Sequence, residues 1–255
     1  MSAGPGPAGA APVALVATTA EVLAHPELGE GLLAPWERRR LAGIRVPGRR
    51  DDVLAARLLL RLCASRATGL EPGDVEPAQR CPGCGRDGHG RPYLPDRPGL
   101  GVSFSHADGL AAAAVGPGPV GIDVEPLTRR PGPVSVLRRL LPQDEVDAAC
   151  AEPDPGPALL RLWVRREALF KAGRDDVRLT AWTDRRRAAV VALAGAGSAL
   201  VPAGGVDDGA LVPSAGAAGA LVPPAGGDEA LVPPLSLGPA PSPSPCPSPA
   251  PPSGR

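Results

Sequence analysis

Two acidic residues stand two positions apart in an apolar segment that reads Gly-Ile-Asp-Val-Glu at residues 121–125. If this segment is a strand, its apolar side chains face one way, while Asp123 and Glu125 face the other, about 6.6 Å apart along the strand. Two carboxylates on one strand face with an apolar back suit a hard divalent cation such as Mg²⁺. A solvated strand face gives the same alternation, so the motif predicts a metal site only together with other residues.

A second group of chemically capable residues recurs at four-residue spacing, so that Trp163, Glu167 and Lys171 share one side of a helix. An ordinary surface pair of Glu167 and Lys171 would contribute a few tenths of a kcal/mol. However, Lys171 is the only lysine in a chain whose other basic residues are all arginines. An ammonium can act as a point donor to phosphate or release a proton, which a guanidinium cannot do. We therefore interpret Lys171 as a functional residue.

Strands and helices must bring these two groups together. A Gly-Pro-Gly-Pro turn at 116–119 predicts that the strands on either side of it form a hairpin. Alternation and helical periodicity predict strands at 13–18, 101–107, 110–115, 120–125, 177–183 and 188–193, and helices at 134–150 and 158–172, the latter closed by Gly173.

Another helix is expected between Arg49 and Gly69, with an aspartate near its N-cap and the glycine as its C-terminal stop. Arg50, Arg57 and Arg61 form a narrow basic stripe along this helix. Two interpretations are open for the stripe: a solvated face, or a contact for a phosphate or an acidic partner.

Four motifs in order resemble those of the Sfp-like 4′-phosphopantetheinyl transferases. The family signature G-[IV]-D-x-E, followed after about forty residues by W-x-x-K-E-A-x-x-K, is similar to G-I-D-V-E at 121–125 and W-V-R-R-E-A-L-F-K at 163–171. Upstream, G-R-P at 90–92 is similar to the family's G-[KR]-P, and F-S-H at 104–106 falls where the family has F-N-x-S-H-[ST]. Residues 55–61 resemble the arginine-containing N-terminal helix of the family. The resemblance spans residues 36–195.

The resemblance implies a reaction in which a carrier-protein serine attacks the β-phosphate of coenzyme A, takes the phosphopantetheine arm and releases 3′,5′-ADP. It implies that Glu167, or a water on the metal, accepts the serine proton and that Lys171 steadies the phosphate. The implied magnesium ligands are Asp123, Glu125 and Glu167. The implied coenzyme A contacts are Arg57, Arg91, Ser105, His106, Arg166 and Lys171.

The resemblance also implies an α+β fold in which two similar α+β subdomains form a pseudo-dimer within one chain, with coenzyme A at their junction. We place the halves at 12–116 and 117–195. Residues 1–11 are expected to be a disordered N-terminus. Residues 196–255, in which Ala-Leu-Val-Pro recurs, are expected to be a disordered Pro/Ala/Gly-rich tail, because so few large side chains cannot form a core.

This chain departs from the family pattern at three positions. Arg166 replaces the usual lysine, Ser103 the usual asparagine, and Ala107 the usual serine or threonine. Three rival functions are a metal-dependent hydrolase of a pyrophosphate compound, a non-catalytic carrier-protein-binding relative, and a zinc-knuckle interaction module. The choice among carrier proteins of fatty acid, polyketide or peptide synthesis stays open.

Cys81-Pro-Gly-Cys84 with His89 downstream has the spacing of half a zinc site. A closed structural site needs four ligands, and the fourth would have to be Cys63, Cys150 or His106, the last of which has a competing role in the resemblance. The alternative is a reduced Cys-x-x-Cys turn without a metal.

The overall composition limits the kinds of binding partner and the cellular compartment that we expect for this protein. The 255 residues balance 27 basic against 27 acidic side chains, which argues against a nucleic-acid partner. No segment approaches the roughly 20 apolar residues of a membrane span. Five scattered cysteines are unlike a secreted disulfide framework. We therefore expect a cytoplasmic protein, a monomer, that contacts neither nucleic acid nor membrane.

Overall fold

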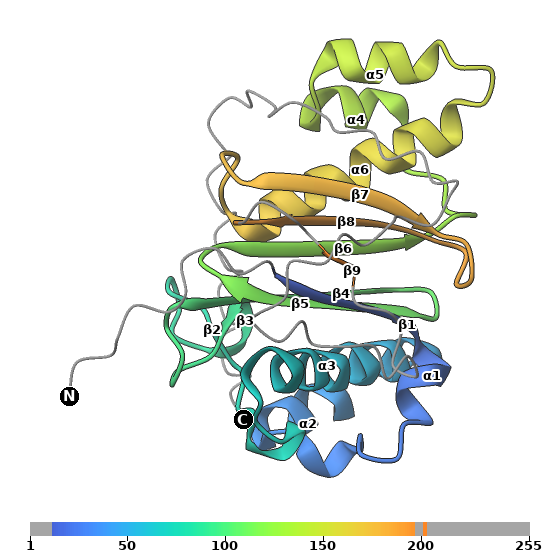
Figure 1. The fold of residues 1–255 in the computed structure, drawn as a ribbon. Coiled ribbons are helices and arrows are strands. Elements are labelled where there is room, and N and C mark those ends of the chain that lie inside the picture. Colours follow the sequence, from blue (N-terminus) through green and yellow to red (C-terminus); the bar gives the residue numbers. More distant parts are fainter. Residues whose placement is uncertain (1–11, 197–200, 203–255) are drawn as a thin grey trace, which may run out of the picture.

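Two β-sheets lie face to face, and one long helix covers the outer face of each (Figure 1). The computed structural model describes residues 12–196 and the strand at 201–202. The first sheet has the strand order β2-β3-β4-β5-β1-β9 and the second has β6-β8-β7. Neighbouring strands are antiparallel, except that β1 and β9 are parallel. The strands are β1 (Val13–Thr18), β2 (Ala78–Arg80), β3 (Asp87–Tyr93), β4 (Leu100–Ala107), β5 (Leu110–Pro117), β6 (Val120–Pro126), β7 (Arg178–Asp184), β8 (Ala189–Gly195) and β9 (Val201–Pro202).

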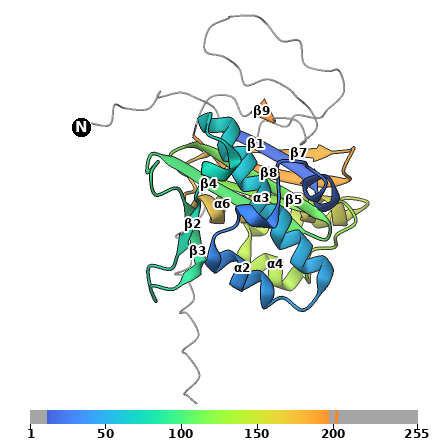
Figure 2. The same cartoon turned by 90° about the horizontal axis from the view of Figure 1, so that it is seen from below.

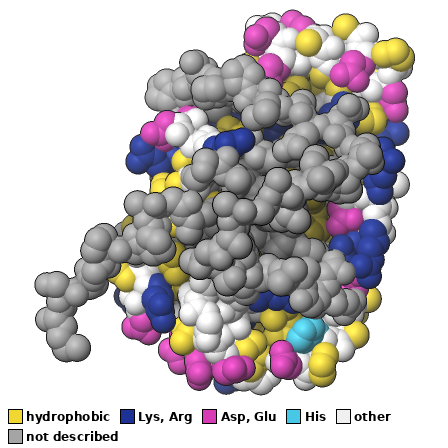
Figure 3. Space-filling view, in the orientation of Figure 1, with side chains coloured by type: hydrophobic (Ala, Val, Ile, Leu, Met, Phe, Trp, Pro, Cys, Tyr) yellow, Lys and Arg dark blue, Asp and Glu magenta, His cyan; other side chains and the backbone are white. Residues whose placement is uncertain are grey.

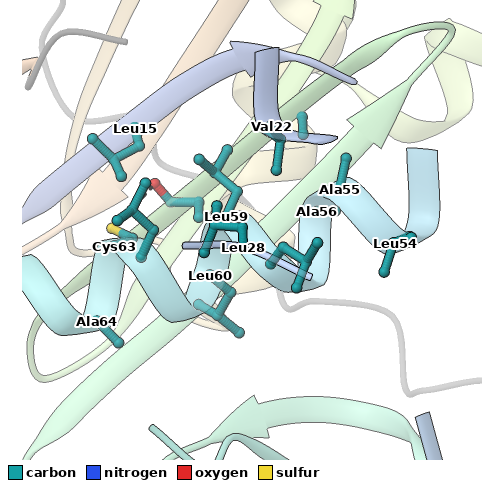
Figure 4. Packing of buried hydrophobic residues seen from close by; sticks show 14 of the residues in the cluster. Leu15, Val22, Leu28, Leu54, Ala55, Ala56, Leu59, Leu60, Cys63 and Ala64 are labelled. Atoms are coloured by element: carbon teal, nitrogen blue, oxygen red, sulfur yellow. Dashed lines mark hydrogen bonds between the residues drawn. The ribbon is translucent and has the colours of Figure 1, made fainter. Parts of the chain in front are cut away.

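The helix α3 (Pro47–Thr68) packs on the outer face of the first sheet through a leucine- and alanine-rich side (Figure 4). It begins two residues earlier than predicted, because a proline at the first helical position loses no hydrogen bond and has a suitable φ. Its C-cap is Gly69 at φ 75°, as predicted. No aspartate caps the helix; Asp52 instead accepts hydrogen bonds from the Thr19 hydroxyl and the Gly109 amide.

The alanine run of β5 allows layers to pack closely on both faces of this strand. Ala111, Ala113 and Val115 face α3, while Ala112 and Ala114 face the second sheet. All five side chains are buried. Because successive side chains alternate along a strand, a continuous small apolar run suits a strand that is covered on both sides.

The predicted hairpin across 116–119 is wrong. The strand β5 pairs with β4 and β1, whereas β6 pairs with β8 in the other sheet. The hairpin forms instead between β4 and β5, through Asp108 at φ 38° and Gly109 at φ 86°, which suit a two-residue turn. The crossover to the second sheet lies against Gly101, where a Cβ would come within 2.0 Å of the Gly118 carbonyl oxygen.

The single helix predicted at 134–150 is two short helices, because Pro142 interrupts the helical hydrogen bonding between them. The long helix α6 (Pro155–Ala172) begins at the Asp154 N-cap and ends at Gly173 with φ 72°, as predicted for its end. The remaining helices are α1 (Thr19–Leu23), α2 (Pro35–Ala42), α4 (Val134–Leu140), α5 (Gln143–Cys150) and the 3₁₀ turns η1 (Glu30–Leu32) and η2 (Pro72–Asp74).

The expected disordered segments lie mostly outside the described residues, namely at 1–11, 197–200 and 203–255. One part of the expected tail is described, where β9 pairs with β1. The expectation of a disordered tail stays a prediction. Charged side chains of both signs are spread over the described surface that is visible in Figure 3. Among the helices of the described chain, none combines the length and apolar character needed to cross a bilayer.

The basic stripe on α3 is not a solvated face. Arg57 and Arg61 are 4% and 2% exposed, and both bond to Glu37, which α2 carries and which is 1% exposed. The Arg57 guanidinium also lies 4.8 Å from the Trp36 ring centroid. Only Arg50 at the start of the stripe is near solvent, where it pairs with the exposed Glu30. The solvated-face interpretation is therefore wrong for the two buried arginines, which join α2 to α3.

Candidate active site

The strand β6 presents two buried carboxylates toward α6. Its apolar side chains pack between the sheets. Gly121 faces the other way, since a Cβ there would lie 1.9 Å from the Ala168 carbonyl oxygen of α6. Asp123 and Glu125 alternate onto this same face and are 5% and 9% exposed. A solvated strand face is therefore excluded, and the missing side chain at Gly121 is what lets α6 approach the acidic residues.

Lys171 reaches across from α6 to β6. Its Nζ lies 2.6 Å from Asp123 Oδ1 and donates to the Ser105 hydroxyl at 2.8 Å and to the Ile122 carbonyl at 3.1 Å. The Ser105 hydroxyl donates to the same Asp123 oxygen at 2.7 Å. The ammonium therefore joins α6, β4 and β6 at one point, and in the described chain it forms no ion pair within 4.0 Å with Glu167. The surface-pair interpretation of Lys171 is wrong.

The carboxylates are only partly neutralised. Asp123 Oδ2 and Glu125 Oε2 are buried without a hydrogen-bond partner. Burial raises the pKa of Glu125 to about 7, although the Arg129 guanidinium, 3.7 Å from Oε2, opposes the shift. Burial, and next the Asp123 charge, also raise the pKa of Glu167. Burial therefore makes ionisation of these carboxylates costly, and a bound cation would lower that cost. Carboxylate oxygens of this kind are a donor set that suits Mg²⁺.

The three predicted magnesium ligands are neighbours, but their carboxylate oxygens do not all lie within 4.8 Å of one another. Of the Cys, His, Asp and Glu residues in the described ranges, only Cys81, Cys84 and His89 form a trio whose ligand atoms all lie within 4.8 Å of one another. Asp123 Oδ1 is bound by Lys171 and Ser105, which leaves its other oxygen for a ligand. Magnesium keeps several waters and needs few carboxylates, so a loose arrangement still fits this ion.

Two predicted coenzyme A contacts lie on opposite faces of β4. Ser105 faces β6, as does Ser103, whose hydroxyl accepts a hydrogen bond from the Ile122 amide at 3.0 Å. His106 is half-buried on the other face, where Asp52 lies near enough to affect its ionisation. Burial lowers the pKa of His106, and the surrounding lysine and arginines lower it further. The structure thus brings Ser105 onto Asp123 and leaves His106 on the α3 side.

Arg91 on β3 lies over the C-terminal end of α6. Its Nη2 donates to the Phe170 carbonyl at 3.3 Å. A Cβ at Gly173 would lie 1.8 Å from Arg91 Nη1, so the glycine leaves room for the guanidinium. The exposed guanidinium therefore lies next to the turn of α6 that carries Lys171.

The structure does not bring the other two arginines of the predicted coenzyme A set to the carboxylates. Arg166 lines a shallow hollow between α5 and α6 with Leu162 and Leu169, although its charge lowers the pKa of the adjacent Glu167. Arg57 is enclosed by the Glu37 cluster, as described above. Both roles stay predictions.

Sequence reasoning missed Arg129, which lies four residues after Glu125 and whose Nε is 3.7 Å from Glu125 Oε2. The sequence shows a basic residue shortly after Pro126. It did not stand out as a site residue because arginines are abundant throughout this chain. The hydrogen bond of Ser103 to the β6 backbone was also missed, since it depends on how the two sheets pack.

The similarity of this chain to known proteins includes the elements that carry the carboxylates and the lysine. The family model of the 4′-phosphopantetheinyl transferase superfamily matches residues 119–203, which include β6 and α6. A 4′-phosphopantetheinyl transferase of Bacillus subtilis is 28% identical over 116 residues, which are 45% of this chain and 48% of that protein. The chain therefore matches about half the length of this curated relative.

The transferase match contains the buried carboxylates and the lysine. Asp123, Glu125, Glu167 and Lys171 all lie within 119–203. Ser105 and Arg91 precede the matched segment, and they reach the same place only through the sheet packing. The resemblance to a phosphopantetheinyl transferase is thus confirmed at family level.

Proposed function

We propose that the protein transfers the phosphopantetheine arm of coenzyme A to a serine of an apo acyl or peptidyl carrier protein and releases 3′,5′-ADP. The observation that carries the proposal is the contact of Lys171 and Ser105 with Asp123, beside two buried carboxylate oxygens that accept no hydrogen bond. The family match of the segment that supplies Asp123 and Lys171 supports the same reaction.

Asp123, Glu125 and Glu167 would hold Mg²⁺, as in a holo-acyl-carrier-protein synthase. The ion supplies charge neutralisation to the pyrophosphate when it is bound. A phosphoryl group at this position would meet the Lys171 ammonium, with Arg91 at the adjacent end of α6. Both cations would lower the energy of the charge that develops on the leaving phosphate.

Glu167 is the residue we assign as the acceptor of the serine proton. Burial and the nearby Asp123 charge raise its pKa when no metal is bound, and a cation at the site would favour the ionised carboxylate that can accept a proton. The serine oxygen then attacks the β-phosphorus, its bond to phosphorus forms, and the bond to the 3′,5′-ADP oxygen breaks. Lys171 remains at the phosphate as an electrostatic stabiliser.

As parts of the same proposal, the two halves of the chain are similar α+β subdomains with coenzyme A at their junction. The protein acts as a cytoplasmic monomer, without nucleic acid or membrane. Support for the junction comes from Ser105 on the first sheet meeting Asp123 on the second.

Intact-mass spectrometry of an apo carrier protein incubated with the enzyme, Mg²⁺ and coenzyme A tests this function. We expect the carrier to gain the phosphopantetheine mass while 3′,5′-ADP appears in equal amount. Release of 3′,5′-ADP without a modified carrier would instead indicate a pyrophosphate hydrolase. An unchanged carrier and intact coenzyme A across fatty acid, polyketide and peptide carriers would contradict catalysis and favour a binding role.

A further inference from the structure

The hairpin β2–β3 carries a group of metal-ligating side chains that the proposed transfer reaction does not use. Cys81 and Cys84 lie in its loop, and His89 lies on β3. Their ligand atoms all lie within 4.8 Å of one another, and Cys84 Sγ is 3.3 Å from His89 Nε2. Tetrahedral zinc with ordinary bond lengths would separate a sulfur and a nitrogen ligand by about 3.5 Å. The observed spacing is therefore already close to that of a bound ion.

The backbone of the loop holds both sulfurs in this position. The Gly85 amide donates to the Cys81 carbonyl at 2.9 Å, and the Cys81 amide donates to the Arg86 carbonyl at 3.0 Å. Gly85 has φ 67°, a conformation that glycine adopts without strain. The turn thus folds Cys84 back toward Cys81.

This hairpin has few apolar contacts to stabilise it, although Arg40 Nη1 donates to the Gly88 carbonyl and Arg57 Nη2 donates to the Gln79 side chain. None of the apolar side chains in 78–93, all of which the structure describes, is buried. The hairpin joins the rest of its sheet through one residue pair, Tyr93 with Gly101. Figure 2 shows it extending beside the two-sheet body. A segment without an apolar core of its own gains stability from a metal that crosslinks it.

We propose that Cys81, Cys84 and His89 bind Zn²⁺ and that a water completes the tetrahedron. Two thiolates and an imidazole are ligands typical of zinc, whereas magnesium prefers oxygen ligands. None of the three predicted fourth ligands reaches the trio. Cys63 is buried in the α3 core, Cys150 packs in the α4–α5 cluster, and His106 faces α3 from β4.

The zinc ion would order the strand that presents Arg91, which is two residues beyond His89. This consequence rests on the proposed function, whereas zinc binding itself does not. With β3 held in place, the Arg91 guanidinium stays over the Phe170 carbonyl at the end of α6. Arg91 is in this view a phosphate contact, and the zinc trio positions it.

Elemental analysis and cobalt substitution of the full-length protein test the site. We expect one zinc per chain after purification or after addition of ZnCl₂ and dialysis. Replacement by Co²⁺ should give the near-ultraviolet thiolate charge-transfer band and the visible bands of tetrahedral cobalt. Cys84→Ser and His89→Gln should each weaken zinc retention by at least about tenfold. Cys150→Ser, a thiol outside the trio, should retain zinc like the wild type.

Tryptic cleavage after Arg80 and Arg86 reports on the hairpin without any activity assay. Zinc should slow cleavage there in the wild type and should have no effect on the Cys84→Ser protein. The proposal is overturned if zinc does not bind in stoichiometric amount, if cobalt lacks the thiolate band, or if Cys150→Ser loses zinc as readily as Cys84→Ser.

The link to Arg91 has its own readout. Removing zinc with a chelator and restoring Mg²⁺ should raise the KM for coenzyme A severalfold with a smaller change in kcat. An unchanged KM would overturn the positioning role and leave the zinc site standing. Zinc binding in a protein that transfers nothing to any carrier would overturn the proposed function alone.

Discussion

At the scale of single residues, burial distinguishes the acidic pair on β6 from an ordinary amphipathic strand. The sequence predicted that Asp123 and Glu125 share a face, and the structure confirms it. Their unpartnered oxygens could not be predicted, because burial depends on α6 packing across β6. The same packing explains why Lys171 bonds to Asp123 rather than to Glu167 on its own helix.

Glu125 should make the metal-free protein less stable as the pH rises. Its pKa is raised to about 7 in the folded state from 4.5, so its contribution to stability is complete below about pH 4.5 and is lost as the pH rises through 7. The variant Glu125→Gln has no carboxyl to ionise, so its free energy of unfolding should not fall with pH at this position. Without divalent metal we expect the variant to be more stable than the wild type by up to about 3 kcal/mol near pH 8, and by less than about 1 kcal/mol near pH 5.

Urea unfolding at the two pH values measures this difference. Saturating Mg²⁺ should stabilise the wild type near pH 8 and should stabilise Glu125→Gln less, since the variant lacks one ligand charge. A variant that is no more stable than the wild type near pH 8 would show that Glu125 ionises without cost in the folded protein.

Lys171 offers an unusually clean chemical test, because it and the N-terminal amine are the only amines in the chain. We expect Mg²⁺ plus coenzyme A to protect Lys171 from an amine-acylating reagent, while the N-terminus reacts as before. Lys171→Arg should lose most of its transfer rate with a modest loss of coenzyme A binding, because a planar guanidinium cannot reproduce three contacts made by one ammonium. Peptide mapping and steady-state kinetics provide the readouts.

Failure of coenzyme A to protect Lys171, together with wild-type rates for Lys171→Arg, would contradict a role for this ammonium at the phosphate. Lys171 would then only neutralise Asp123 within the fold. The catalytic assignment would rest on the carboxylates alone.

At the scale of elements, the contact of α6 with β6 depends on Gly121. A methyl group there would lie 1.9 Å from the Ala168 carbonyl oxygen and 2.5 Å from the Ala172 amide nitrogen, both of which are backbone atoms that cannot move alone. Gly121→Ala should therefore destabilise the protein by at least about 2 kcal/mol and displace Lys171 from Asp123. Gly99→Ala, where nothing lies within 4 Å of the added carbon, should change stability by less than about 0.5 kcal/mol.

Chemical unfolding of the two alanine variants side by side measures this difference. Equal stabilities would mean that α6 can shift away from β6 without cost, and the geometry of the site would then not depend on the glycine.

The pairing of α2 with α3 through Glu37 is a second element-scale feature. Glu37→Gln leaves the buried Arg57 and Arg61 without a counter-charge and should cost about 3–5 kcal/mol. Glu30→Gln breaks the exposed pair with Arg50 and should cost less than about 1 kcal/mol. Thermal unfolding of the two variants compares a buried with an exposed ion pair. Similar melting temperatures would show that the buried cluster does not hold the helices together.

At the scale of the whole molecule, periodicity predicted most strand and helix positions, but it did not predict which strands pair. The strands at 110–115 and 120–125 were identified correctly, yet they belong to different sheets. The first pairs with β1 and, through a two-residue turn, with β4, whereas the second pairs with β8, which lies far along the chain. The burial of Arg57 was not predicted, because its partner Glu37 lies twenty residues earlier on another helix. The hairpin β2–β3 lacks an apolar pattern and was not predicted as strands at all.

The residues of the candidate site were predicted from the spacing of sequence motifs and not from any prediction of how the two sheets pack. Asp123, Glu125, Glu167 and Lys171 were identified because two short motifs resemble a known family, and the family match covers them. Their meeting with Ser105 required two sheets to pack face to face, with alanines and glycines at the contacts. Such packing is a property of the whole chain, and no local pattern encodes it.

The most direct test of this account is carrier-protein modification by the wild type and by Asp123→Asn, measured in parallel by intact-mass spectrometry. The variant keeps the size of the side chain but removes the charge that faces Lys171 and the proposed magnesium ion. With circular dichroism confirming that both proteins are folded, we predict a carrier that gains phosphopantetheine with the wild type and stays unmodified with the variant over the same period. A wild type that leaves every apo carrier unmodified, or an Asp123→Asn protein that works at the wild-type rate, would contradict it.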